Sequence, residues 1–245
     1  MARKPRARKP RARKSSPLYL PSAFDLFTPS KDLVLKNIHV FGPLFILPFI
    51  FWGHSWLDIP AGAGHYWGRI TDANYSWPFP SAFWAAFIGF SIIWFLIVIV
   101  GGVIVQIMLQ RAQLEASQNK EPNFHELWGA VKKIWKKMTL LFLAMTGLII
   151  GGFILLIIPG LIMLRRYFFA PYVMLERNCS VGEALSRSAK LSAVNTGSVW
   201  GVIGVSVLIS LLGVIPLIGS LASFVVGSLY CVAPALRYQQ LKKLA

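Results

Sequence analysis

Residues 83–109 read FWAAFIGFSIIWFLIVIVGGVIVQIML, a run of 27 residues without one charged side chain. A helix needs about 20 mainly apolar residues to cross the hydrocarbon core of a bilayer, so this run predicts a membrane-spanning helix. An extended segment cannot take its place, because an unpaired backbone N–H or C=O in hydrocarbon costs several kcal/mol. The run therefore indicates an all-α membrane protein.

The composition of the whole chain agrees with lipid as its main solvent. The 245 residues are 56% hydrophobic and only 14% charged, whereas a typical soluble domain has roughly 25% charged residues. A soluble protein of this length cannot hide so much apolar surface, because folding leaves a large share of the chain exposed. We therefore expect one membrane domain over residues 18–245, preceded by a disordered, basic cytoplasmic tail over residues 1–17.

Six apolar runs predict a polytopic helix bundle with six transmembrane helices, at residues 38–56, 83–109, 138–158, 159–176, 199–215 and 217–236. Two joints between runs are tight, namely Ile158-Pro159-Gly160 and the segment 213–216, which ends in proline. Proline ends a helix and glycine accepts a turn, so we interpret both joints as hairpin tips. The alternative is a kink within one long helix.

Positive charge lies on one side of this arrangement. With the N-terminus inside, the inner segments hold 22 Lys and Arg residues and the outer segments hold Arg69 alone. The positive-inside rule then predicts that both termini are cytoplasmic. A net charge of +16 also fits nucleic acid, but the basic residues lie beside apolar runs, which favours anionic headgroups of membrane lipids as the partner.

Three cytoplasmic segments predict amphipathic helices, at residues 22–36, 123–137 and 180–192. The second has Trp on an apolar face and Lys opposite, which is typical of a helix lying in the membrane interface, although packing on the protein's own surface is the alternative. Its predicted membrane-surface residues are Trp128, Lys132, Lys133, Trp135, Lys136 and Lys137. The third has small residues that favour packing on the bundle.

The starts of these helices carry a further pattern. Asn123 with Glu126, and Ser180 with Glu183, have the spacing of a capping box. Each amphipathic helix also precedes two apolar runs. The chain therefore fits a threefold repeat of one amphipathic helix and one hairpin, as a hypothesis.

Two arginines fall within the fourth predicted span. Arg165 and Arg166 lie roughly 9 Å below its outer end, at 1.5 Å per residue. An arginine at the centre of a span costs about 2.5–3.5 kcal/mol. Either they snorkel or pair within the protein, or one lines a polar cavity for an anionic group such as a lipid phosphate. Tyr167 and Tyr172 offer hydroxyls to that predicted ligand site, and Pro171 predicts a kink.

No catalytic, metal or cofactor pattern stands out in the sequence. The motifs of P-loop enzymes, serine hydrolases and zinc proteases do not occur. The only cysteines, Cys179 and Cys231, do not make a zinc site by themselves. We therefore expect no enzyme activity, no metal and no cofactor.

Residues 158–192 read IPGLIMLRRYFFAPYVMLERNCSVGEALSRSAKLS. They resemble a bacterial multi-pass family that includes the YciC-like proteins and the membrane domain named after glycerophosphoryl diester phosphodiesterase. The shared pattern consists of Ile158-Pro159-Gly160, Ala170-Pro171, Glu176, Glu183-Ala184-Leu185, Arg187-Ser188 and Leu191. The resemblance implies a protein of the bacterial inner membrane from an uncharacterised family. It does not imply phosphodiesterase activity, because the soluble catalytic domain is not expected in this sequence.

These observations predict a non-enzymatic integral membrane protein that organises the membrane or binds a lipid or another amphiphile. One alternative is a transporter or permease subunit with a site around the fourth span. Another is a membrane partner of a lipid-processing enzyme. Small-residue spacings such as Gly147-xxx-Gly151 are compatible with packing within one chain and with a homo- or hetero-oligomer.

Overall fold

Helices provide all the regular structure of the described residues, which are 20–52, 81–215 and 218–245 of a computed structural model. The predicted all-α class is confirmed over this part of the chain. The predicted tail over residues 1–17 lies outside it. The helices are α1 (Phe27–Lys36), α2 (Ile38–Trp52), α5 (Ser81–Ser117), α6 (Phe124–Leu155), α7 (Ile157–Tyr167), α8 (Ala170–Arg177), α9 (Val181–Val194), α10 (Thr196–Leu212), α11 (Ile218–Tyr230) and α12 (Ala233–Lys242).

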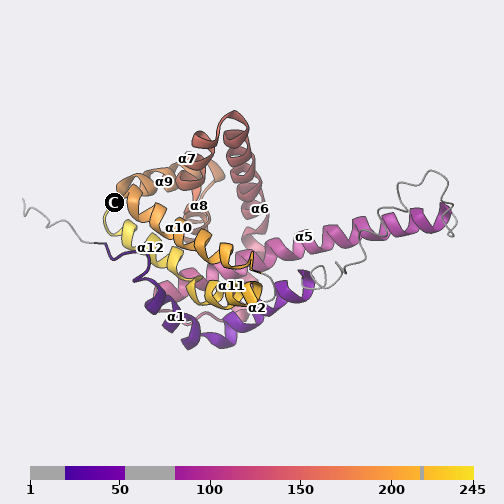
Figure 1. Cartoon of the computed structure of the whole chain (residues 1–245), viewed down its shortest axis with the longest axis horizontal. Coiled ribbons are helices and arrows are strands. Elements are labelled where there is room, and N and C mark those ends of the chain that lie inside the picture. Colours follow the sequence, from indigo (N-terminus) through magenta and orange to yellow (C-terminus); the bar gives the residue numbers. More distant parts are fainter. Residues whose placement is uncertain (1–19, 53–80, 216–217) are drawn as a thin grey trace, which may run out of the picture.

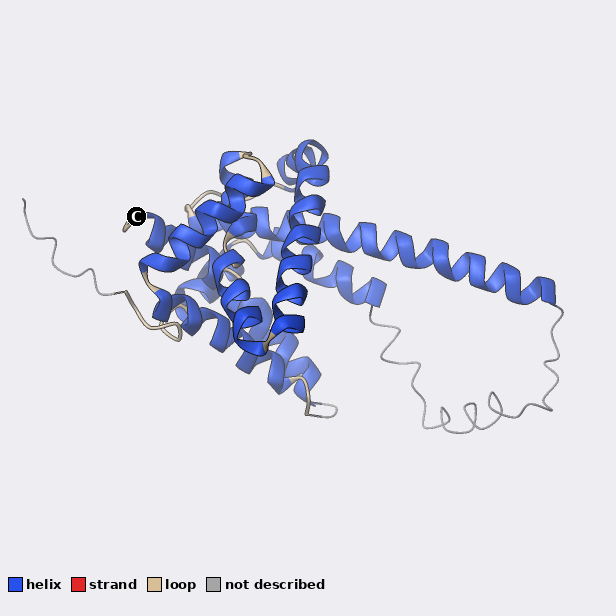
Figure 2. Ribbon diagram, turned by 90° about the horizontal axis from the view of Figure 1, so that it is seen from above, coloured by secondary structure: helices blue, strands red, loops and turns tan. Residues whose placement is uncertain are grey.

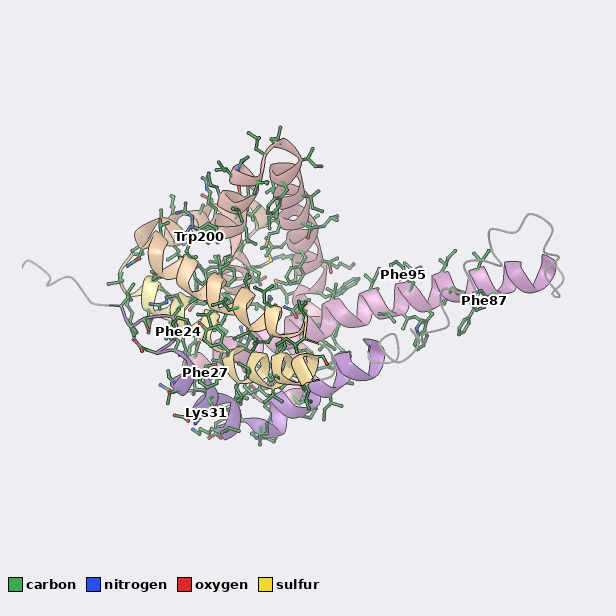
Figure 3. All side chains as sticks on the ribbon, in the orientation of Figure 1. Phe24, Phe27, Lys31, Phe87, Phe95 and Trp200 are labelled. Carbon is green, nitrogen blue, oxygen red and sulfur yellow. The ribbon has the colours of Figure 1, made fainter. Side chains whose placement is uncertain are left out.

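A packed body carries apolar helical arms. Figure 1 shows α5 running far out of the body and the α6–α7 hairpin leaving it in another direction, and Figure 2 shows the same long arm of α5 from above. The arms expose large apolar side chains: Phe95 is 63% exposed and Ile154 is 80% exposed. Phe95 and Phe87 are labelled on the α5 arm in Figure 3. Apolar surface of this extent needs lipid to cover it.

Three helical stretches are long and apolar enough to cross a membrane: Phe87–Ser117, Phe124–Leu155 and Gly219–Lys242. A fourth exists only if α9 and α10, bent by 103°, count as one span. The chain therefore has the helices of a membrane protein, but six spans are not confirmed. Two of the described helices are short, because α7 and α10 have 11 and 17 residues. At 1.5 Å per residue they measure about 16–26 Å, less than a hydrocarbon core of about 30 Å.

The boundary expected near residue 137 is absent. The predicted interfacial helix 123–137 and the predicted span from residue 138 form one helix, α6, of 32 residues. Met138 favours the helix and has no side chain that competes for backbone hydrogen bonds, so the helix continues. Asn37 and Asn195 instead separate α1 from α2 and α9 from α10. Asparagine does compete for backbone groups, and the Asn195 side chain caps α10.

The α6–α7 hairpin turns at Leu156, slightly before the predicted tip. Pro159 lies in the first turn of α7, where its missing N–H leaves no bond unmade. Glycines let the two helices touch: a Cβ on Gly152 would lie 2.9 Å from the Cα atom of Gly160, and a Cβ on Gly160 would lie 2.5 Å from the Phe153 ring. The second predicted hairpin tip, at residues 213–216, begins directly after Leu212, the last residue of α10.

The predicted fourth span is broken at Phe168 and Phe169, between α7 and α8, next to Pro171. The kink that this proline predicted is confirmed. Helix α9 packs on the bundle, as its small residues predicted, and it covers the break. Its Ser188 hydroxyl donates to the carbonyl of Arg166 at 2.8 Å, and its Ser192 hydroxyl donates to the carbonyl of Arg165 at 2.9 Å. These bonds satisfy carbonyl groups that the end of α7 leaves without helical partners.

A second break, between α11 and α12, is covered in the same way by α1. The Ser30 hydroxyl donates to the carbonyl of Leu229 at 2.7 Å and accepts from the N–H of Val232 at 3.2 Å. The amphipathic helix of one predicted unit thus docks on the broken helix of another unit, twice. The contact thus recurs with matched residues in two of the three predicted units, and the threefold repeat stays a hypothesis.

Candidate functional site

The first four turns of α6 have one buried face and one exposed face. Leu127, Val131 and Ile134 belong to the hydrophobic core. Trp128 and Trp135, on the other side, are 40% and 41% exposed. The packing on the protein's own surface is therefore observed, and the predicted contact of the other face with the membrane interface stays a prediction.

The exposed face forms what we name the α6 basic surface, made of Trp128, Lys132, Lys133, Trp135, Lys136 and Lys137. Each tryptophan has an ammonium group over its ring: the Nζ atom of Lys132 lies 5.5 Å from the Trp128 ring centroid, and that of Lys136 lies 5.9 Å from the Trp135 centroid. Cation–π contacts of this kind hold the lysines beside the indoles. The surface is therefore an ordered array of positive charge and aromatic rings.

This array lies directly before the apolar half of the same helix. Residues 138–155 contain no charged side chain, and Leu140 and Leu143 among them are exposed. Tryptophan and lysine at the end of an apolar stretch are typical of the level of the lipid headgroups. The Nζ atom of Lys137 also donates to Oδ1 of Asn178 at 3.1 Å, which ties this level of α6 to the end of α8.

The four residues of the predicted ligand site do not come together. The Arg165 guanidinium donates to the Thr196 hydroxyl at 2.6 Å, and the Tyr172 hydroxyl donates to Oε1 of Gln113 at 2.7 Å. Arg165 therefore faces α10 and Tyr172 faces α5, so both have structural partners. The break in the predicted span causes this separation, because α8 changes direction after α7.

Arg166 and Tyr167 remain available to a ligand. They line a surface pocket of about 580 Å³ between α7 and α9, together with Lys190. The prediction that they bind an anionic group stays a prediction.

A cluster that the sequence did not indicate joins α8 to α12. The Tyr238 hydroxyl donates to Oε2 of Glu176 at 2.6 Å, and the Lys242 ammonium donates to Oε1 of the same carboxylate at 2.6 Å. Burial raises the pKa of Glu176, but the hydrogen bonds from Lys242 and Tyr238 outweigh it and hold this pKa below its ordinary value. These residues are more than 60 positions apart, so no local pattern revealed the cluster.

A second pocket, of about 550 Å³, lies beside this cluster between α8, α9 and α12. We name it the α8–α9–α12 pocket. Figure 1 shows the C-terminus next to α9 at this part of the body. Its lining includes four basic side chains, Arg177, Arg187, Lys190 and Lys242.

Metal chemistry has no obvious place in the described part of the chain. Within residues 20–52, 81–215 and 218–245, no three His, Cys, Asp or Glu side chains come together as a metal site would require.

Comparison of the chain with protein-family models, with curated proteins and with solved structures gives no match. The resemblance of residues 158–192 to the YciC-like family therefore stays a prediction.

Proposed function

We propose that this chain is a non-enzymatic integral protein of a bacterial inner membrane that binds the anionic headgroups of the cytoplasmic leaflet. The observation that carries the proposal is the α6 basic surface. Four lysines and two exposed tryptophans occupy the turns of α6 immediately before its uncharged half. Each basic residue near an anionic membrane surface contributes about 1 kcal/mol of attraction, so four act together.

The proposed orientation puts both termini on the cytoplasmic side. Two contacts join α6, or the residues just before it, to neighbouring helices that carry basic residues. The Lys137 ammonium bonds to Asn178 after α8, and the Lys36 ammonium lies 3.5 Å from the Glu121 carboxylate before α6. We propose that the first half of α6, with the basic residues of α1 and α8 that are joined to it, faces the cytoplasm, in line with the positive-inside rule.

The test compares two variants with equal loss of charge. In the first, Lys132, Lys133, Lys136 and Lys137 are changed to Gln. In the control, Lys31, Lys36, Lys120 and Lys243 are changed to Gln. Native mass spectrometry of each protein, extracted in mild detergent with phosphatidylglycerol and cardiolipin present, counts the anionic lipids retained.

We expect the first variant to retain fewer anionic lipids than the control. Equal retention by both variants would contradict the proposal. The assumed orientation is tested separately, by labelling single cysteines at the two termini from either side of the membrane, and termini on opposite sides would overturn it.

A further inference from the structure

The α8–α9–α12 pocket has the charge, shape and lining of a ligand site. Arg177 comes from the end of α8, Arg187 and Lys190 come from α9, and Lys242 comes from the end of α12. Three helices thus direct four cations at one concave space of about 550 Å³. Pockets for small ligands commonly measure 300–1,000 Å³, so this space has a suitable size.

Two of the four cations already have partners. Arg187 pairs with Glu183 at 2.7 Å, and Lys242 pairs with Glu176 at 2.6 Å. Arg177 and Lys190 form no hydrogen bond or ion pair with any other described residue. The pocket therefore has basic groups without an ion-pair partner, and such groups attract a phosphate monoester, which has a charge of about −1.5 to −2 at pH 7.

The remaining lining is mainly apolar, and it includes the last two residues, Leu244 and Ala245. Val173 of α8 and Leu191 and Val194 of α9 form this part of the wall. The hydroxyl of Tyr238 is occupied by Glu176, so this residue offers the pocket its ring. A wall of this kind accommodates hydrocarbon.

We propose that the α8–α9–α12 pocket binds a phosphate monoester carried on an apolar chain, as in a phosphatidate-type lipid. Arg177 and Lys190 hold the phosphate, because guanidinium and ammonium groups form short, charge-assisted bonds to phosphate oxygens. Val173, Leu191 and Val194 contact the start of the chain. This site shares no residue with the α6 basic surface, so it does not depend on the headgroup binding proposed above.

The test measures binding to the full chain in a neutral detergent by isothermal titration calorimetry. Three probes separate the sources of affinity: dioctanoyl phosphatidate, dioctanoyl glycerol and inorganic phosphate. We expect the phosphatidate to bind, the neutral lipid not to bind, and inorganic phosphate to bind at least tenfold more weakly. Equal affinity for inorganic phosphate, or for the neutral lipid, would overturn the proposal.

A pair of matched variants assigns the binding to this pocket. Arg177→Gln combined with Lys190→Gln removes the two unpaired cations, and we expect a loss of affinity on the order of tenfold or more. Lys31→Gln combined with Lys120→Gln removes the same charge at positions outside both this pocket and the α6 basic surface, and we expect it to bind phosphatidate as the parent chain does. Equal losses in both variants, or no loss in the first, would contradict the assignment. Unchanged unfolding temperatures exclude misfolding as the cause of a loss.

Discussion

Ser30 and Ser188 hold equivalent places in two parts of the fold. The hydroxyl of Ser30 donates to the carbonyl of Leu229, and the hydroxyl of Ser188 donates to the carbonyl of Arg166. Each serine lies eight residues after a serine that caps the start of its segment, and each acceptor lies five residues before a proline. The two breaks and the two helices that cover them are therefore built in the same way.

The third unit shows why the serine is there. Its equivalent position, eight residues after Asn123, is Val131, which is buried in the hydrophobic core, and α6 packs against α5 among other helices. Helix α5 is unbroken from Ser81 to Ser117, so its carbonyl groups keep their helical partners. A helix that packs on a broken helix can supply a hydroxyl to the carbonyl groups at the break. A helix that packs on an unbroken helix needs only an apolar side chain at the same position.

We predict that Ser188→Ala destabilises the protein by about 1–3 kcal/mol, because a buried carbonyl loses its hydrogen bond. Ser30→Ala is expected to act in the same direction, since the Ser30 hydroxyl bonds to two backbone groups. Thermal unfolding in detergent measures the change. The control is Ser210→Ala, which removes only a bond within α10 from an exposed side chain. A loss no larger than that of the control would contradict the role of the two serines.

Gly152 and Gly151 of the α6–α7 hairpin should respond differently to substitution by alanine. Gly152→Ala places a Cβ 2.9 Å from the backbone of Gly160, and we expect a loss of about 1–3 kcal/mol from the forced separation of the helices. Gly151→Ala meets nothing within 4 Å, and it is expected to be neutral or slightly stabilising because alanine favours the helix. The unfolding temperatures of the two variants give the comparison. Similar effects at both positions would argue against the close contact of α6 and α7.

Tyr172 and Tyr167 should respond differently to loss of their hydroxyls. Tyr172→Phe leaves the buried Oε1 atom of Gln113 without its donor, so we expect a loss of about 1–3 kcal/mol. Tyr167→Phe removes a hydroxyl that lines the surface pocket, and we expect a change within about 0.5 kcal/mol. Unfolding in detergent separates the two variants. A loss of stability in Tyr167→Phe, together with no loss in Tyr172→Phe, would contradict this assignment.

The Glu176 cluster predicts a dependence of stability on pH. Because hydrogen bonds hold the pKa of Glu176 low in the folded protein, its contribution is fully present above the unfolded pKa of about 4.3 and is lost as pH falls through the folded pKa. We therefore expect Glu176→Gln to lower the unfolding temperature at pH 7 and to differ less from the parent chain below pH 4. The control is Glu183→Gln, whose ion pair with Arg187 is more exposed and should matter little. A difference that persists unchanged at low pH would contradict the assignment.

Some elements followed directly from local sequence. Asn123 and Ser180 cap α6 and α9 as their spacing predicted, since the bonds join residues two or three positions apart. The buried and exposed faces of α6 also followed from helical periodicity. The place of the α6–α7 turn did not, because it depends on the contact between Gly152 and Gly160 of two different helices.

The positions of Arg165 and Arg166 could not be predicted from local sequence patterns either. Arg165 pairs with Thr196, 31 residues later, and Arg166 reaches a pocket formed with α9. Their place depends on how α9 covers the break before Pro171. The six predicted membrane-spanning helices are not confirmed for a related reason, since hydropathy measures how apolar a run is but not where its helix breaks.

By itself, the sequence determined that this protein is helical, needs lipid around its apolar runs, and gathers its positive charge beside them. Those properties depend on composition and on bonds between near neighbours, which every conformation of the chain shares. Only the tertiary structure decided which serine covers which break, that Glu176 meets Tyr238 and Lys242, and that four cations of α8, α9 and α12 surround one pocket. Such contacts join residues far apart in the chain, and the packing of whole helices brings them together.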